Sequence, residues 1–202
     1  LEAVLVAMSF QPSACELMDK IILDLTKQNI EQKKNRFFVE GDPEGILMVE
    51  FRGDTFEEAR DQGKAMIAAL EEAGLGYAYP IVEAPKTKQA WDLRKAGLGL
   101  LANIPGDAKP VACIEDTAVD IKDLPAYIKE FDQLMANFGQ QAVYYAHAGA
   151  GELHLRPILD LKKAEGQRLF YEITKAVAKL VKKYNGSLSG EHGDGRVRAE
   201  FI

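Results

Sequence analysis

Apolar residues follow a helical spacing in some parts of the chain and form short or alternating runs in others. The helical spacing predicts helices after Pro12-Ser13 and over residues 54–73, 87–101, 124–138 and 166–184. The short runs predict strands over residues 1–9, 45–51, 77–82, 110–115, 143–147 and 153–155. The second and third of these strands, with the helix between them, are predicted to form a β-α-β unit.

Helices and strands alternate along the chain, yet some strands follow one another with no helix between them. This arrangement favours antiparallel pairing over a doubly wound parallel sheet. The sequence therefore predicts an α+β fold that is ferredoxin-like, with a mostly antiparallel sheet covered by helices. The length of 202 residues and the hydrophobic content of 47% are enough for one large domain or two small ones.

The net charge of the chain is −6 at pH 7. A phosphate-binding surface needs a basic excess, so the charge argues against nucleic acid and anionic membranes as partners. Apolar runs such as residues 3–8 are too short to span a bilayer, and the first residues do not resemble a signal peptide. We predict a cytoplasmic protein without a transmembrane segment, with peripheral association with the inner membrane as the alternative.

The two cysteines, Cys15 and Cys113, are far apart in the sequence and form no Cys-x-x-Cys motif. Such usage suits a reducing compartment, so both are predicted to be free thiols that serve in packing. The sequence begins at Leu1 rather than at a methionine. We therefore expect residues 1–202 to be one domain of a longer protein.

All three histidines lie in the last third of the chain, in two glycine-rich motifs. The first motif contains His147 and His154, and the second contains Glu191 and His192. If the chain turns at Ala150-Gly151, the first two histidines lie opposite each other, with Cβ atoms roughly 4.5–5.5 Å apart. Two imidazoles at this spacing can bind one ion at about 2.0–2.1 Å. Glu191 would be the third ligand, and the remaining open positions are typical of a catalytic metal.

Other interpretations of these motifs stay open at the level of the sequence. The histidines can be cross-strand surface residues, and the glycines can simply form turns. A metal-dependent hydrolase would instead use His147, His154 and Glu191 to activate water. A third alternative is a non-enzymatic ferredoxin-like module that binds a small ligand or a partner protein.

Four segments together resemble a known family, namely WDLRKAGLGLL at 91–101, AKPVACIEDTAV at 108–119, HAGAGELH at 147–154 and LSGEHGDG at 188–195. They resemble the C-terminal substrate domain of FAD-linked oxidases. These are the vanillyl-alcohol-oxidase-like flavoproteins, which include glycolate oxidase, D-lactate dehydrogenase and D-2-hydroxyglutarate dehydrogenase. The resemblance covers nearly the whole chain and is strongest to the long bacterial fusions that add an iron–sulfur region.

The resemblance implies that the parent protein is an FAD-dependent 2-hydroxy acid dehydrogenase of the D-lactate, glycolate or D-2-hydroxyglutarate type. An N-terminal domain of the same polypeptide would bind FAD and would be the partner of this domain. The Cα hydride of a small 2-hydroxy carboxylate would pass to flavin N5, and an iron–sulfur region would receive the electrons. The isolated domain is expected to fold without turning over substrate, and a homo-oligomer is compatible with the sequence.

The same resemblance assigns roles to individual residues of this chain. His147, His154 and Glu191 would ligate a divalent metal, usually zinc. His192 would be the base that takes the hydroxyl proton. Arg94 would bind the substrate carboxylate, because a guanidinium forms two parallel charge-assisted hydrogen bonds to a carboxylate.

Some residues depart from the family pattern or have alternative roles. Stand-alone relatives often have Asp and Asn where this chain has Ala150 and Glu152, and Glu152 is expected to disfavour a substrate with a second carboxylate. Arg94 has the alternative of a surface arginine on an amphipathic helix, and His192 that of a loop histidine bonded to backbone. Asp116 is expected either to orient a ligand histidine or to cap the following turn.

Overall fold

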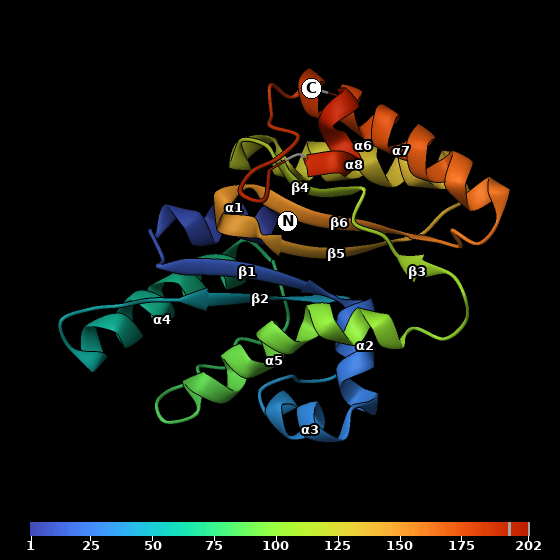
Figure 1. Ribbon diagram of the computed structural model, residues 1–202. Coiled ribbons are helices and arrows are strands. Elements are labelled where there is room, and N and C mark those ends of the chain that lie inside the picture. The colour runs from blue at the N-terminus through green and yellow to red at the C-terminus, as the bar shows by residue number, and fades with distance from the viewer. Residues whose placement is uncertain (194, 202) are drawn as a thin grey trace. The chain divides into compact units, whose positions relative to one another are not determined.

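The computed structural model describes residues 1–193 and 195–201, so Asp194 of the second motif and Ile202 lie outside the described residues. The chain divides into two compact units, an N-terminal one that ends at Leu100 and a C-terminal one. Both units combine helices with antiparallel strands, which confirms the predicted α+β class (Figure 1). In the part of the chain that is described, no helix has both the length and the apolar composition needed to cross a membrane.

The N-terminal unit is built around one antiparallel strand pair, β1 and β2. Its elements are α1 (Glu2–Ser9), β1 (Ala14–Asp19), α2 (Lys20–Gln28), α3 (Ile30–Lys33), β2 (Gly45–Glu50), α4 (Phe56–Glu72) and α5 (Thr87–Leu100). Helix α2 packs against α5, and α1 packs against α4. The hydroxyl of Thr55 accepts the N–H of Glu58 at 3.2 Å and thereby begins α4 at the predicted position.

Three predictions for the N-terminal unit are wrong. Residues 1–9 form helix α1 rather than a strand, and two of their apolar residues three positions apart are buried on one helix face. The segment after Pro12-Ser13 forms β1 before α2 begins, instead of one helix. Residues 77–82, all of which are described, form no strand, so the β-α-β unit is absent. Pro80 in this segment lacks the N–H that a paired strand would donate.

The C-terminal unit has the strand order of a ferredoxin-like fold. Its elements are β3 (Lys109–Pro110), β4 (Ile114–Ala118), α6 (Leu124–Asn137), β5 (Ala142–His147), β6 (Glu152–Leu159), α7 (Ala164–Lys183) and the short α8 (Gly195–Arg198). Strand β6 lies between β5 and β4 and is antiparallel to both. The succession β4-α6-β5-β6-α7 therefore confirms the predicted ferredoxin-like arrangement in this unit.

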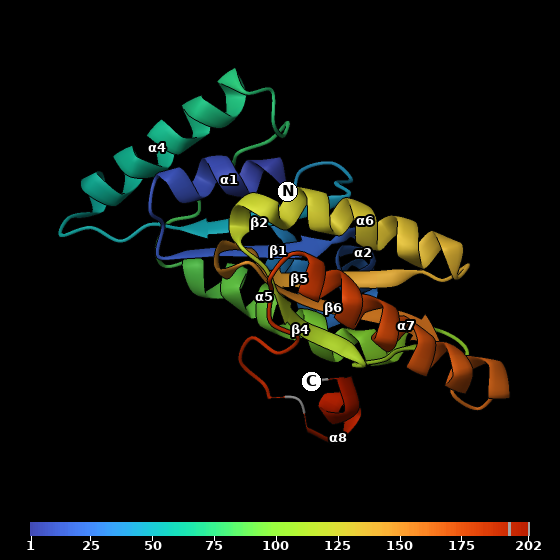
Figure 2. The ribbon, with the colours of Figure 1, turned by 90° about the horizontal axis from the view of Figure 1, so that it is seen from above.

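The two faces of this C-terminal sheet differ. Helices α6 and α7 lie side by side over one face (Figures 1 and 2). Tyr127 of α6 donates a hydrogen bond to Thr117 of β4, which lies opposite Leu153 of β6, so Leu153 points toward the helices. Successive residues of a strand point to opposite faces. Glu152 and His154 therefore point to the face that α6 and α7 leave uncovered.

Both cysteines are buried and free, with Cys15 in β1 and Cys113 just before β4. This confirms the packing role predicted for them. Burial raises the pKa of each thiol to about 11, so both stay protonated at neutral pH.

Candidate metal centre

The first histidine motif forms the turn between β5 and β6, but in a different register from the predicted one. A turn at Ala150-Gly151 would place His147 opposite His154. Instead, His147 lies opposite Glu152, and His154 lies opposite Tyr145. The two histidines are diagonal neighbours on one face, with ring centroids 5.1 Å apart. They still converge, although they are not a directly opposed pair.

Gly151 explains this register. Its φ is 70°, and a Cβ at this position would lie 2.0 Å from the backbone oxygen of Val119. Only glycine fits such a close approach. The N–H of Val119 also donates to the oxygen of Gly151 at 3.0 Å. A turn of 3-10 helix at residues 148–150 precedes Gly151 and moves the centre of the hairpin toward the N-terminus.

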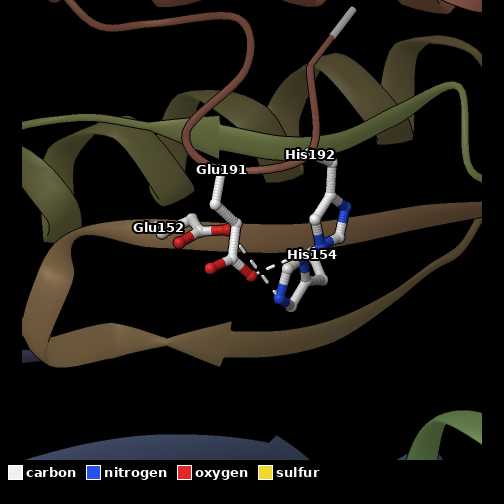
Figure 3. Close-up of side chains that lie close together, drawn as sticks. All are labelled: Glu152, His154, Glu191 and His192. Atoms are coloured by element: carbon white, nitrogen blue, oxygen red, sulfur yellow. Dashed lines mark ion pairs between the residues drawn. The ribbon is translucent and has the colours of Figure 1, made fainter. Parts of the chain in front are cut away.

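Four side chains with metal-binding atoms point toward one another on the face of the C-terminal sheet opposite α6 and α7 (Figure 3). Glu152 and His154 come from β6, whereas Glu191 and His192 come from the loop that follows α7. One ligand atom of each lies within 4.8 Å of the others. His147 lies beside this group, with its Nε2 3.6 Å from Oε1 of Glu191. The structure thus brings together all four residues that the two motifs predicted.

Asp116 holds the loop that carries Glu191 and His192. It is the extra residue of a β-bulge in β4, with a φ of 80° that is uncommon outside glycine. Its buried carboxylate accepts hydrogen bonds from the Ser189 hydroxyl at 2.5 Å and from the N–H groups of Glu191 at 2.9 Å and His192 at 2.8 Å. Asp116 therefore fixes a loop that is distant in sequence, rather than capping the turn that follows it.

Glu115 orients the ring of His192. Its Oε1 lies 3.3 Å from Nδ1 of His192, and its Oε2 forms an ion pair with Arg156. On the other side of the ring, Nε2 of His192 lies 3.3 Å from Oε1 of Glu191. The ring also stacks on that of His154, with centroids 5.2 Å apart. The alternative of a loop histidine bonded to backbone therefore does not describe this side chain.

Carboxylates outnumber guanidinium groups in this cluster. The carboxylates are those of Glu115, Asp116, Glu152 and Glu191, and the guanidinium groups are those of Arg156 and Arg198. Burial, a hydrogen bond with Asp116 and repulsion by Glu191 raise the pKa of Glu152 to about 7. Burial opposes ionisation of Asp116 as well, but the hydrogen bonds from Glu152 and the loop lower the pKa of Asp116 below its usual range. The excess of negative charge favours a bound cation.

The donor set fits a divalent metal. Imidazole nitrogens and carboxylate oxygens are ligands of zinc and of other first-row divalent ions. Two ligand atoms on opposite sides of such an ion are about 4.2 Å apart, since each lies at about 2.1 Å. The 4.8 Å spread of this group is close to that value. Small side-chain movements would therefore bring His154 and Glu191, with the adjacent His147, around one ion.

Arg94, the predicted ligand of the substrate carboxylate, belongs to the N-terminal unit. It lies on α5 and is 5% exposed, so the alternative of a surface arginine is wrong. Its Nη2 lies 2.6 Å from Oε2 of Glu16. A guanidinium has five N–H donors in one plane and can contact more than one carboxylate. A role toward the substrate therefore stays a prediction.

The sequence analysis missed the roles of Glu115 and Arg156 and considered Glu152 only as a source of repulsion. The pattern of β6 contained part of the information, because Glu152, His154 and Arg156 occupy alternate positions and so share a face. Glu115 and Asp116 are adjacent in sequence. Only the bulge in β4, which has no clear sequence pattern, lets both reach the same cluster.

Comparison with known proteins decides the family. The model of the C-terminal domain of FAD linked oxidases matches residues 2–202. The chain belongs to this family. The FAD-linked oxidase domain described here is 35% identical to a D-2-hydroxyglutarate dehydrogenase of Pseudomonas putida, over 96% of the chain and 20% of that protein. It is also 26% identical to a D-lactate dehydrogenase of Archaeoglobus fulgidus, over 96% of the chain and 39% of that protein. The resemblance inferred from the four sequence segments is thereby confirmed.

This FAD-linked oxidase domain spans about a fifth of the length of the D-2-hydroxyglutarate dehydrogenases that it matches. A glycolate oxidase subunit of Bacillus subtilis is 25% identical, over 78% of the chain and 32% of that protein. Among solved structures, 4-ethylphenol oxidase from Gulosibacter chungangensis aligns with 93% of the chain and 41% of its own, with a TM-score of 0.53 and 11% identity. At that identity the likeness concerns the fold alone.

Proposed function

We propose that this domain is the substrate- and metal-binding part of an FAD-dependent 2-hydroxy acid dehydrogenase. The observation that carries the proposal is the convergence of three histidines and Glu191 on one face of the C-terminal sheet. Relatives of this domain include D-2-hydroxyglutarate dehydrogenases and a D-lactate dehydrogenase, which supports a 2-hydroxy acid as the substrate. The reaction would give the 2-oxo acid. The hydride would leave the hydroxyl-bearing carbon, and the proton would leave its oxygen.

His147, His154 and Glu191 would hold a divalent metal, for which the family resemblance favours zinc. When bound, the metal supplies Lewis acidity that lowers the pKa of the substrate hydroxyl. His154 is fixed within β6, where it is 5% exposed. Glu191 is fixed through its backbone, because its N–H donates to Asp116. The two central ligands thus come from segments that the fold holds firmly.

His192 would take the hydroxyl proton of the substrate. Once Glu191 is engaged in binding the metal, the carboxylate of Glu115, 3.3 Å from Nδ1, would favour the tautomer that has its proton on Nδ1. Nε2 is then the acceptor. Because Nε2 lies 3.3 Å from the carboxylate of Glu191, the acceptor is adjacent to a proposed metal ligand. A hydroxyl placed on the metal would therefore be within reach of the base.

Arg94 would bind the substrate carboxylate through charge-assisted hydrogen bonds. FAD, bound by a part of the polypeptide outside this chain, supplies the hydride acceptor. An iron–sulfur cluster that receives the electrons is likewise proposed for another part of the parent protein. Such clusters need about four thiolate ligands. The two cysteines of this chain are both buried and do not fit that requirement.

The proposal is tested by anaerobic flavin reduction in the full-length natural protein. We expect at least one of D-2-hydroxyglutarate, D-lactate and glycolate to bleach the visible absorbance of the flavin. Bleaching should be lost after treatment with a chelator and restored by a divalent metal, because the metal activates the hydroxyl.

The controls separate this function from its alternatives. His154→Ala should slow bleaching, whereas Glu165→Gln, which changes an exposed carboxylate on α7, should leave it unchanged. A flavin that dithionite reduces but none of the three acids reduces would contradict the proposal. Hydrolytic activity that needs no flavin would favour the metal-dependent hydrolase instead.

A further inference from the structure

Glu152 is a buried acid of the cluster to which the proposed function gives no role. It is the first residue of β6 and is 7% exposed. Its Oε1 lies 3.9 Å from Nε2 of His154. This oxygen is buried and accepts no hydrogen bond within the described part of the chain. Figure 3 shows the Glu152 carboxylate at one side of the group, next to the side chain of Glu191.

The position of this carboxylate is fixed from two sides. The carboxyl group of Glu152 lies beside the buried carboxyl group of Asp116. Gly190 lies over its side chain, since a Cβ there would be 3.0 Å from Cγ and 3.2 Å from Cδ of Glu152. The carboxylate therefore has little freedom to turn toward solvent, and Oε1 stays directed at the cluster.

A buried carboxylate oxygen without a donor is costly, and such atoms usually have a partner in native proteins. Oε1 lies near an imidazole nitrogen of His154, and one carboxylate oxygen of Glu152 lies within 4.8 Å of ligand atoms of Glu191 and His192. A divalent cation is a partner that these donors and Oε1 can all share. A protonated Glu152 that only bonds to Asp116 would leave Oε1 unsatisfied.

We propose that Glu152 is a fourth protein ligand of the metal held by His147, His154 and Glu191. This inference rests on the proposed function and adds a second carboxylate to its metal site. Four protein ligands would complete the tetrahedral shell of zinc and leave no position for the substrate. An ion that accepts six ligands, such as Mn²⁺, retains two positions. The hydroxyl and one carboxylate oxygen of a 2-hydroxy acid would fill those two positions.

The test is calorimetric titration of the full-length protein with Mn²⁺ and, separately, with Zn²⁺. Glu152→Gln keeps the size of the side chain, and its amide can donate to Asp116, but it cannot provide a charged carboxylate ligand. Loss of a group that merely orients a ligand costs about 10- to 100-fold in affinity, so we expect the Kd for Mn²⁺ to rise at least about 10-fold. The Kd for Zn²⁺ should rise less, because carboxylates matter more for Mn²⁺ than for Zn²⁺.

Two further variants make the result decisive. Glu152→Asp keeps the charge but withdraws the carboxylate by one methylene, so direct ligation predicts weakened Mn²⁺ binding here too. It also tests the proposal if Glu152→Gln does not fold. Glu165→Gln removes an exposed charge of the same sign and should bind both metals as the wild type does.

The outcomes distinguish this inference from the proposed function. Unchanged Mn²⁺ affinity in the folded Glu152 variants, together with weaker binding in His154→Ala, would overturn the role of Glu152 and leave the proposed function standing. Weaker binding in Glu152→Gln alone, with Glu152→Asp unchanged, would overturn direct ligation in favour of a charge effect. A folded wild type that binds neither metal would overturn the metal site on which both proposals rest.

Discussion

The His192→Gln variant is expected to oxidise the proposed 2-hydroxy acid substrate with a kcat about 10²- to 10⁴-fold below that of the wild type. This is the usual contribution of a positioned general base. The substitution removes the proposed base for the hydroxyl proton, whereas the proposed metal ligands and the proposed carboxylate ligand Arg94 would remain, so KM should change much less. Steady-state kinetics of the full-length protein, on whichever acid bleaches its flavin fastest, measures both constants.

Metal affinity is the companion measurement, because a ligand atom of His192 lies within 4.8 Å of those of Glu152, His154 and Glu191. A base can be lost without loss of the metal, whereas a ligand cannot. If the variant loses metal and activity together, His192 is a ligand, and if it keeps the wild-type kcat, it is not the base. Glu115→Gln should lower kcat by a smaller factor, since Glu115 acts only by orienting the ring.

The Asp116→Asn variant is expected to bind the metal about 10- to 100-fold more weakly than the wild type, as is typical when a partner that orients metal ligands is lost. The carboxylate accepts hydrogen bonds from three donors of the loop that carries Glu191. Asparagine places an NH₂ group against some of these donors. Since asparagine tolerates a positive φ, the bulge should persist and the loop should be released. The measurement is the Kd for the metal in the full-length protein.

The same substitution should lower the free energy of unfolding by about 1–3 kcal/mol, the cost of a buried polar group left unsatisfied. The hydrogen bonds lower the pKa of Asp116, so its ionised form stabilises the fold at neutral pH. The difference in free energy of unfolding between the wild type and the variant should shrink as the pH falls toward the lowered pKa of Asp116. Asp107→Asn, which changes an exposed ion pair with Lys162, should alter neither stability nor metal affinity. Wild-type metal affinity in a folded Asp116→Asn protein would contradict the role of the loop.

The sequence predicted the elements that carry periodic or capping information. Helices α4, α6 and α7 have apolar faces at helical spacing, and Thr55 caps the first of them. The same analysis was wrong for residues 1–9 and for the segment after Pro12-Ser13. Short apolar runs do not distinguish a strand from a buried helix, and tertiary packing decides between them. The ferredoxin-like strand order was inferred from strands that follow one another without an intervening helix.

For the candidate site, too, the sequence predicted one part and only the structure shows the other. Both glycine-rich motifs are local in sequence, so His147, His154, Glu191 and His192 could be predicted as candidates without the structure. The contacts that position them are not local: Asp116 reaches the N–H of His192 across 76 positions of the chain. The hairpin register depends on the close approach of Gly151 to another segment of backbone. No pattern within either motif contains that information.

The most direct test of the central claim is to locate the metal in crystals of the full-length protein by anomalous scattering at the absorption edge of the bound ion. The account predicts one strong peak per chain, at about 2.0–2.2 Å from a ring nitrogen of His154 and from a carboxylate oxygen of Glu191. The peak should be lost in crystals of His154→Ala. If the loop and β6 are ordered at saturating metal but no peak lies between these two side chains, the result contradicts the account.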